Sequence, residues 1–180
     1  MSLAASLALA AAAAVAPAPA PGEAGLLGLF GAACLAALPD FQQSPAALEA
    51  GGLRPGPVLA SGTQTFASAD RVYVAMVDHD VRRGAVTADI CTIGVLGPGA
   101  PAFTDIETGL NAAARRLAST PPAQECIGET ARVGTCLWYW ESAEGCAGLQ
   151  AQIAQDRVVG LMAVATATRQ EPQTCREAIR

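Results

Sequence analysis

Residues 103–122, FTDIETGLNAAARRLASTPP, carry the strongest helical pattern in the chain and divide it into two groups of strands. Apolar residues recur there at helical spacing and predict a buried stripe: Ile106, Leu110, Ala113 and Leu117. Thr104 and Glu107 have the spacing of a capping box, and Pro121 prevents the helix from continuing. The stretch therefore predicts one amphipathic helix in the middle of the chain.

Three segments before this helix are rich in β-branched and aromatic residues: PVLASGTQTF (57–66), RVYVAMVDHD (71–80) and AVTADICTIGVLG (85–97). Both faces of the second segment are apolar, which predicts a central strand covered on each side. Three more strand candidates follow the helix: ARVGTCLWYWE (131–141), CAGLQAQIAQ (146–155) and RVVGLMAVATATR (157–169). In 146–155, Leu149, Ala151 and Ile153 alternate with glutamines, as in a half-exposed strand.

Two helices are predicted before the first strand, one over 24–38 and a short one from Ser44 to the glycine pair at 51–52. The sequence thus predicts an α+β domain. Its antiparallel or mixed sheet has about six strands in α-βββ-α-βββ order, with helices packed on one face and disulfides in support. The element order suggests a duplication, but the residues of the two halves show no repeat.

Residues 1–20 are apolar and alanine-rich, end in prolines and are typical of a secretory signal peptide. The alternatives are a disordered Ala-rich tail and lipidation at Cys34, which follows small residues in LFGAAC. With the signal removed, residues 21–180 form a single domain without a membrane span, in the periplasm or secreted.

The chain has six cysteines: Cys34, Cys91, Cys126, Cys136, Cys146 and Cys175. No two are close enough for a zinc knuckle or a C-x-x-C redox motif. An even number of cysteines behind an export signal favours three disulfides. Fifteen connectivities are possible, and the predicted order of elements favours the one that consists of Cys34–Cys91, Cys126–Cys136 and Cys146–Cys175.

The formal net charge is −5, and the basic residues are all arginines. This charge disfavours nucleic-acid binding. The sequence also lacks phosphate-binding loops, dinucleotide-binding motifs and a G-x-S-x-G nucleophile motif. We therefore expect no cofactor, no metal and no nucleic-acid partner.

The only histidine, His79, lies between Asp78 and Asp80 at a predicted strand end. It could act as a base oriented by one of these carboxylates, or bind a metal with them. In an extended strand, however, both aspartates point away from His79. The simpler interpretation is a polar strand end before a turn.

Both tryptophans occur in CLWYWE (136–141). Alternation places Trp138 and Trp140 on one face and Tyr139 on the other. Core packing explains this pattern, and the alternative is an aromatic binding surface with Glu141 at its acidic rim. The sequence favours a non-enzymatic binding or inhibitor-like protein, which contacts another protein or a small ligand. The alternative function is a hydrolase that uses His79 with a neighbouring aspartate.

Overall fold

The structure is a computed structural model that describes residues 21–83, 86–128, 133–142, 145–156, 160–170 and 175. The helices are α1 (Pro21–Ala33), the 3-10 helix η1 (Leu35–Ala37), α2 (Ser44–Ala50) and α3 (Phe103–Leu117). The strands are β1 (Arg54–Pro55), β2 (Gln64–Ala67), β3 (Tyr73–Arg83), β4 (Val86–Leu96), β5 (Ala123–Ile127), β6 (Gly134–Ser142), β7 (Gly145–Asp156) and β8 (Gly160–Gln170). The predicted signal peptide, residues 1–20, lies outside the described residues.

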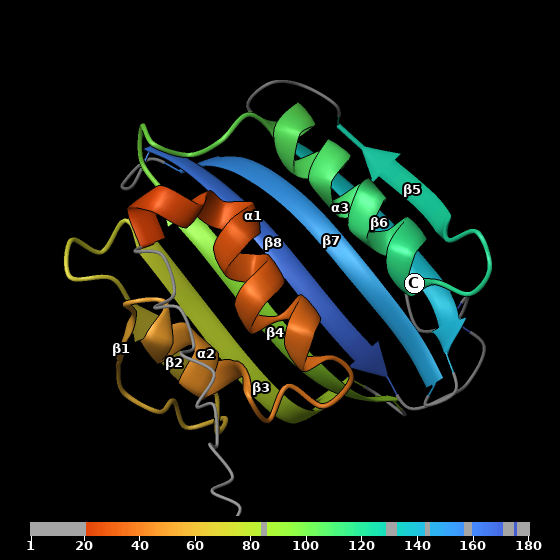
Figure 1. The fold of residues 1–180 in the computed structure, drawn as a ribbon, viewed down its shortest axis with the longest axis horizontal. Coiled ribbons are helices and arrows are strands. Elements are labelled where there is room, and N and C mark those ends of the chain that lie inside the picture. Colours follow the sequence, from red (N-terminus) through yellow and green to blue (C-terminus); the bar gives the residue numbers. More distant parts are fainter. Residues whose placement is uncertain are drawn as a thin grey trace, which may run out of the picture.

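The strands form one antiparallel sheet in the order β1-β2-β3-β4-β8-β7-β6-β5 (Figure 1). Each half of the chain is a helical segment followed by a four-stranded meander, and the two meanders join through β4 and β8. The α+β class is confirmed. The expected strand number and order are wrong, because the described sheet has eight strands rather than six.

Two features explain the extra strands. The predicted strand 57–66 is mostly a loop, and only its end enters β2; β1 adds two residues before it. Strand β5 gave no sequence signal because it is a short edge strand whose residues are mostly exposed. Its backbone pairs with β6, and this long-range pairing does not require an apolar pattern in β5 itself.

The helices cover one face of the sheet, with α1 over β4 and β8 and α3 over β6 and β7 (Figure 1). The core lies between these layers. The middle strand β8 presents Ala163, Ala165 and Ala167 to the helices, whereas β6 presents Trp138 and Trp140. The small alanine side chains let both helices approach the centre of the sheet closely.

None of the described helices lies over the opposite face, which we call the open face (Figure 1). The expectation that β3 is covered on both sides is therefore wrong. Ala75 and Val77 are buried under the helical layer, but Met76 on the open face is 43% exposed. The apolar residues of this strand did not reveal that only one face is covered.

The helix starts also differ from the sequence-based expectation. Helix α3 begins at Phe103, and Ala102 is its N-cap without a side-chain hydrogen bond. Thr104 and Glu107 therefore form no capping box. Phe103 is buried against the sheet, and the helix starts there, two residues earlier than a Thr104 N-cap predicts. Ser44 lies inside α2, and its buried hydroxyl donates to the carbonyl of Ala33 at 2.7 Å.

The structure contains three disulfides, and all three favoured pairings are confirmed: Cys34–Cys91, Cys126–Cys136 and Cys146–Cys175. The first joins the end of α1 to β4, and the second joins directly opposed residues of β5 and β6. Lipidation at Cys34 is excluded because its thiol is used in the disulfide. Within the described residues, no helix has the length and apolar character that a membrane span requires.

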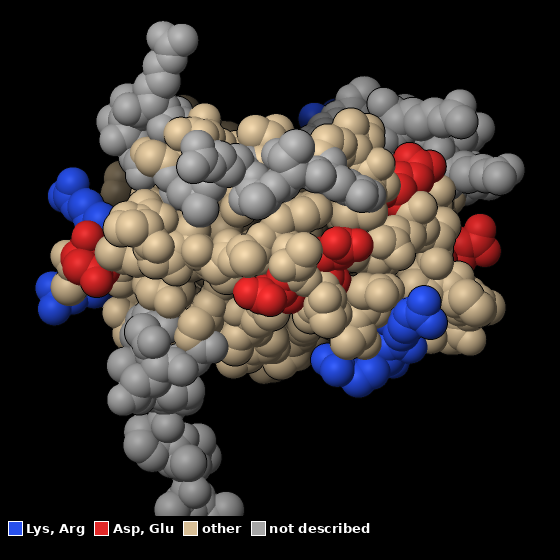
Figure 2. All heavy atoms as spheres, turned by 90° about the horizontal axis from the view of Figure 1, so that it is seen from above, with Lys and Arg blue, Asp and Glu red and all other residues tan. Residues whose placement is uncertain are grey.

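Arginine groups lie toward the edges of the view in Figure 2, and carboxylates are spread among uncharged side chains. Uncharged side chains cover most of the described surface in this view. The expected absence of a nucleic-acid partner stays a prediction.

Candidate binding site

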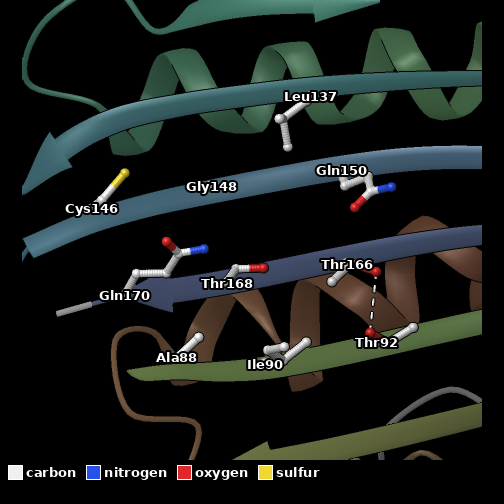
Figure 3. A pocket seen from close by; sticks show the side chains of 10 residues that line it. All are labelled: Ala88, Ile90, Thr92, Leu137, Cys146, Gly148, Gln150, Thr166, Thr168 and Gln170. Carbon is white, nitrogen blue, oxygen red and sulfur yellow. Dashed lines mark hydrogen bonds between the residues drawn. The ribbon is translucent and has the colours of Figure 1, made fainter. Parts of the chain in front are cut away.

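The open face contains a hollow with a volume of about 260 Å³, which we call the Gly148 hollow (Figure 3). It lies over four strands, with the helices on the far side of the sheet. It is lined by Ala88, Ile90 and Thr92 of β4, Leu137 of β6, Cys146, Gly148 and Gln150 of β7, and Thr166, Thr168 and Gln170 of β8.

Strand alternation produces this lining. On β7, Leu149 and Ile153 are buried beneath the helices, whereas Gln150 points to the open face. The expected half-exposed character of this strand is confirmed. On β8 the same alternation sends the alanines inward and places Thr166 and Thr168 on the open face.

The floor of the hollow depends on Gly148, which has no side chain to fill the space between its neighbours. Its Cα partner on β6 is Tyr139. The Tyr139 hydroxyl donates to Glu125 at 3.3 Å, so the phenol extends toward the edge strand β5. A Cβ atom on Gly148 would lie 3.3 Å from the carbonyl oxygen of Trp138, a close approach.

Hydrogen-bonding groups of the hollow are partly unpaired. Thr92 and Thr166 share a hydroxyl–hydroxyl bond of 3.1 Å across β4 and β8 (Figure 3). The amide oxygen of Gln170 is buried and accepts no hydrogen bond. A buried acceptor without a donor is unfavourable by about 1–3 kcal/mol, so this amide gains if its side chain turns to meet a donor.

The disulfide Cys146–Cys175 lies at one end of the hollow, where Cys146 is part of the lining. Both cysteines are buried although Cys146 lies on the open face. Glu141 and Asp78 lie beside the hollow, as the strand partners of Cys146 and Ile90. The lining residues that the structure describes are uncharged.

The expected binding residues of β6 separate between the two faces of the sheet. Trp138 and Trp140 pack under the helices and are 0% and 6% exposed, so the predicted alternation is confirmed. A partner outside the fold can reach Tyr139 and Glu141 on the open face but not the two indole rings. The indole N–H of Trp138 is buried without a hydrogen-bond partner.

His79 lies at a β-bulge of β3, where the register shifts between Asp78 and Val81. Asp80 adopts a positive φ of 56° there, and its backbone N–H donates to Asp89 at 3.0 Å. The nearest carboxylate to His79 is also that of Asp89, with 3.7 Å between Nδ1 and Oδ1. The two aspartates beside His79 in sequence are therefore not its partners.

Sequence reasoning missed Asp89 and its second partner Arg169, 80 residues away, whose Nη1 lies 3.3 Å from Oδ2. They are opposed residues of β4 and β8. Only the final strand pairing brings them together. The carboxylate of Asp89 thus contacts the Asp80 backbone at the bulge, the His79 imidazole and the Arg169 guanidinium at the same time. This arrangement is that of a structural ion pair.

Two other places in the structure are less suited to binding a metal or a ligand. Glu107 lies within reach of Cys126 and Cys136, but these sulfurs are joined in a disulfide and are not free thiolate ligands. A second hollow of about 510 Å³ lies between η1 and α2. Its described lining is mainly alanine, with the hydrogen-bonding side chains of Gln42 and Gln43.

Comparisons with known proteins give no match to a family model, a curated protein or a solved structure.

Proposed function

We propose that this chain is an exported, non-enzymatic binding protein that holds its ligand on the open face of the sheet. The observation that carries the proposal is the Gly148 hollow on the open face, whose described lining residues are uncharged and include several hydrogen-bonding side chains. Concave sites with a few converging polar groups are the usual places for ligand binding.

The disulfides support both the proposed export of the protein and its proposed non-enzymatic function. Structural disulfides persist in oxidising compartments, as expected for a periplasmic or secreted protein. They also engage all six cysteines, which removes thiol nucleophiles and thiolate metal ligands from the chain. The three disulfides join β4 to the residue after α1, β5 to β6, and β7 to Cys175.

The hydrolase alternative receives less support. Asp89 can orient His79, but the same carboxylate also pairs with Arg169 and with the backbone of Asp80. Among the described residues, no serine or threonine hydroxyl forms a hydrogen bond with His79. A base without a nucleophile or a substrate site beside it does not make a hydrolase centre.

Export is tested on protein recovered from the oxidising compartment without reductant. We expect an N-terminus near residue 21 and no free thiols by mass spectrometry. Two or more free thiols in the folded protein would contradict the assignment to an oxidising compartment.

Binding is tested by a fragment screen in which two-dimensional amide NMR spectra of the protein are recorded with neutral, cationic, anionic and apolar small molecules. We expect at least one chemical class to shift the amide signals of Gly148 and Thr166. The variant Gly148→Leu should lose these shifts because its side chain fills the floor. Gly94→Ala is the matched control: its added Cβ lies on the same face, 3.3 Å from Val74, outside the hollow. A screen in which no class shifts these signals would contradict the proposed function.

A further inference from the structure

We propose that the Gly148 hollow binds a small uncharged polyol, a molecule with several hydroxyl groups such as a neutral monosaccharide. This inference rests on the binding function proposed above and specifies its ligand class. Four properties of the hollow carry it: its hydrogen-bonding groups, its apolar residues, its charge and its size.

The hydrogen-bonding groups match hydroxyls. Thr166 and Thr168 present hydroxyls, and Gln150 and Gln170 present amides, from adjacent positions of β7 and β8 (Figure 3). A threonine hydroxyl and a glutamine amide both donate and accept hydrogen bonds. A polyol can pair with such groups whichever of them donates or accepts, because each of its own hydroxyls can also donate and accept.

Gln170 adds a further preference. Its Oε1 atom is buried and has no donor in the folded protein, so a ligand reaches it only when the Gln170 side chain turns toward the hollow. A ligand with O–H or N–H groups would then donate to this oxygen, whereas a hydrocarbon or an ether would not.

Apolar residues occupy the other part of the lining, with Ile90 on β4 and Leu137 on β6. Their side chains can pack against the C–H groups of a polyol while its hydroxyls face the threonines and glutamines. A ligand with a hydroxylated side and a C–H side therefore suits the hollow better than one that is polar all round.

Charge selects against anions. The ten described lining residues carry no charge, so none of them gives an anion a cationic partner to offset the water that it loses. Asp78 and Glu141, the strand partners of Ile90 and Cys146, add only a weak negative field, because Asp78 is half-buried and Glu141 is exposed. This field repels an anion slightly and attracts a cation slightly, and the attraction does not offset the desolvation of the cation.

Size limits the ligand to one ring. The volume of about 260 Å³ lies just below the range of about 300–1,000 Å³ that holds drug-sized ligands. About a dozen non-hydrogen atoms at modest ligand efficiency correspond to a dissociation constant of about 1–10 mM.

The test is an amide NMR titration of the oxidised full-length domain with D-glucose, D-galactose, D-mannose and myo-inositol. D-glucuronate and D-glucosamine are the anionic and cationic counterparts. We expect at least one neutral compound to shift the signals of Gly148, Thr166 and Gln170 with a dissociation constant in the stated range. Glucuronate should bind at least threefold more weakly than the best neutral compound.

Two variants separate the binding site from the fold. Gly148→Leu should abolish the shifts, and Thr166→Val should weaken binding at least threefold by removing one hydroxyl at nearly constant volume. Gly94→Ala should bind as the unmodified protein does. Each variant is accepted only if its amide spectrum retains the dispersion of a folded protein, and Thr166→Val provides the test if Gly148→Leu does not fold.

Several outcomes would overturn the ligand class. These are the absence of shifts with every neutral compound, glucuronate binding as tight as the best neutral compound, and glucosamine binding more than tenfold tighter. If other fragments still shift the Gly148 signal, only the polyol assignment fails and the binding function stands. If nothing binds in the hollow, both fail.

Discussion

Cys34 and Cys91 join the end of α1 to the centre of β4, with their Cα atoms 5.6 Å apart and both residues fully buried. This disulfide links the helical layer to the sheet across the core, over a separation of 57 residues. The disulfide Cys126–Cys136 links two adjacent strands over only 10 residues. The two bonds therefore restrict the unfolded chain to different extents.

We predict that Cys34→Ala/Cys91→Ala lowers the free energy of unfolding by about 4 kcal/mol, whereas Cys126→Ala/Cys136→Ala lowers it by about 3 kcal/mol. The longer loop loses more conformational entropy when it is closed. The first pair is also deeper in the core, so its removal adds a small cavity term. Urea unfolding of the two double variants measures the difference, and an equal or larger loss for the shorter loop would contradict it.

Trp138 combines full burial with an indole N–H that lacks a partner. We predict that Trp138→Ala lowers the free energy of unfolding by about 3–5 kcal/mol, as expected for a large core side chain. Trp138→Phe should lose less than half of that, because it keeps an aromatic ring and removes a donor that is unfavourable by about 1–3 kcal/mol.

Trp140→Phe is the matched control in the same unfolding experiment, because the N–H of Trp140 is not left buried without a partner. Trp138→Phe should be the milder of the two substitutions. A greater loss in Trp138→Phe would show that ring volume outweighs the unpaired N–H at this position.

Asp89 supports three groups, and its substitution tests whether the His79 cluster is structural. We predict that Asp89→Asn lowers the free energy of unfolding by about 1–3 kcal/mol, because it weakens the bonds to Arg169 and to the Asp80 backbone. Asp78→Asn, on the neighbouring bulged strand β3, should change it by less than about 0.5 kcal/mol. Thermal unfolding measures the stability of both variants. Equal losses of stability would contradict a structural role that is specific to Asp89.

Asp70 gives a pH-dependent prediction. The hydroxyl of Ser68 and the backbone N–H of Val72 donate to its carboxylate and hold its pKa below the ordinary value. The stability from these bonds is present above the ordinary aspartate pKa and is lost as the pH falls through the lowered pKa. Ser68→Ala should raise the pKa of Asp70 toward its ordinary value in a carboxyl NMR titration. An unchanged pKa would mean that the hydroxyl does not cause the shift.

The sequence predicted the features that depend on local pattern. Alternation on β7 placed Leu149 and Gln150 on opposite faces, and alternation on β6 separated Trp138 from Tyr139. The order of elements was sufficient to favour the correct disulfide pairings. Predicting each of these features requires only the two-residue period of a strand or the order of the helices and strands along the chain.

The Gly148 hollow and the Asp89–Arg169 pair depend instead on strand register between distant segments. Gly148 leaves a hollow because the side chain of its partner Tyr139 extends toward β5, an edge strand without a sequence signal. Asp89 meets Arg169 only after β4 and β8 pair. Register of this kind arises from the packing of the whole sheet and cannot be derived from either segment alone.

The most direct test of the central claim is a crystal structure of the oxidised protein with the strongest-binding small molecule from the titrations. We predict electron density for the ligand over Gly148, with one of its hydroxyls within hydrogen-bond distance of Gln170 Oε1. Density for the ligand elsewhere, with the Gly148 hollow holding only water, would contradict the assignment of the open face as the binding surface.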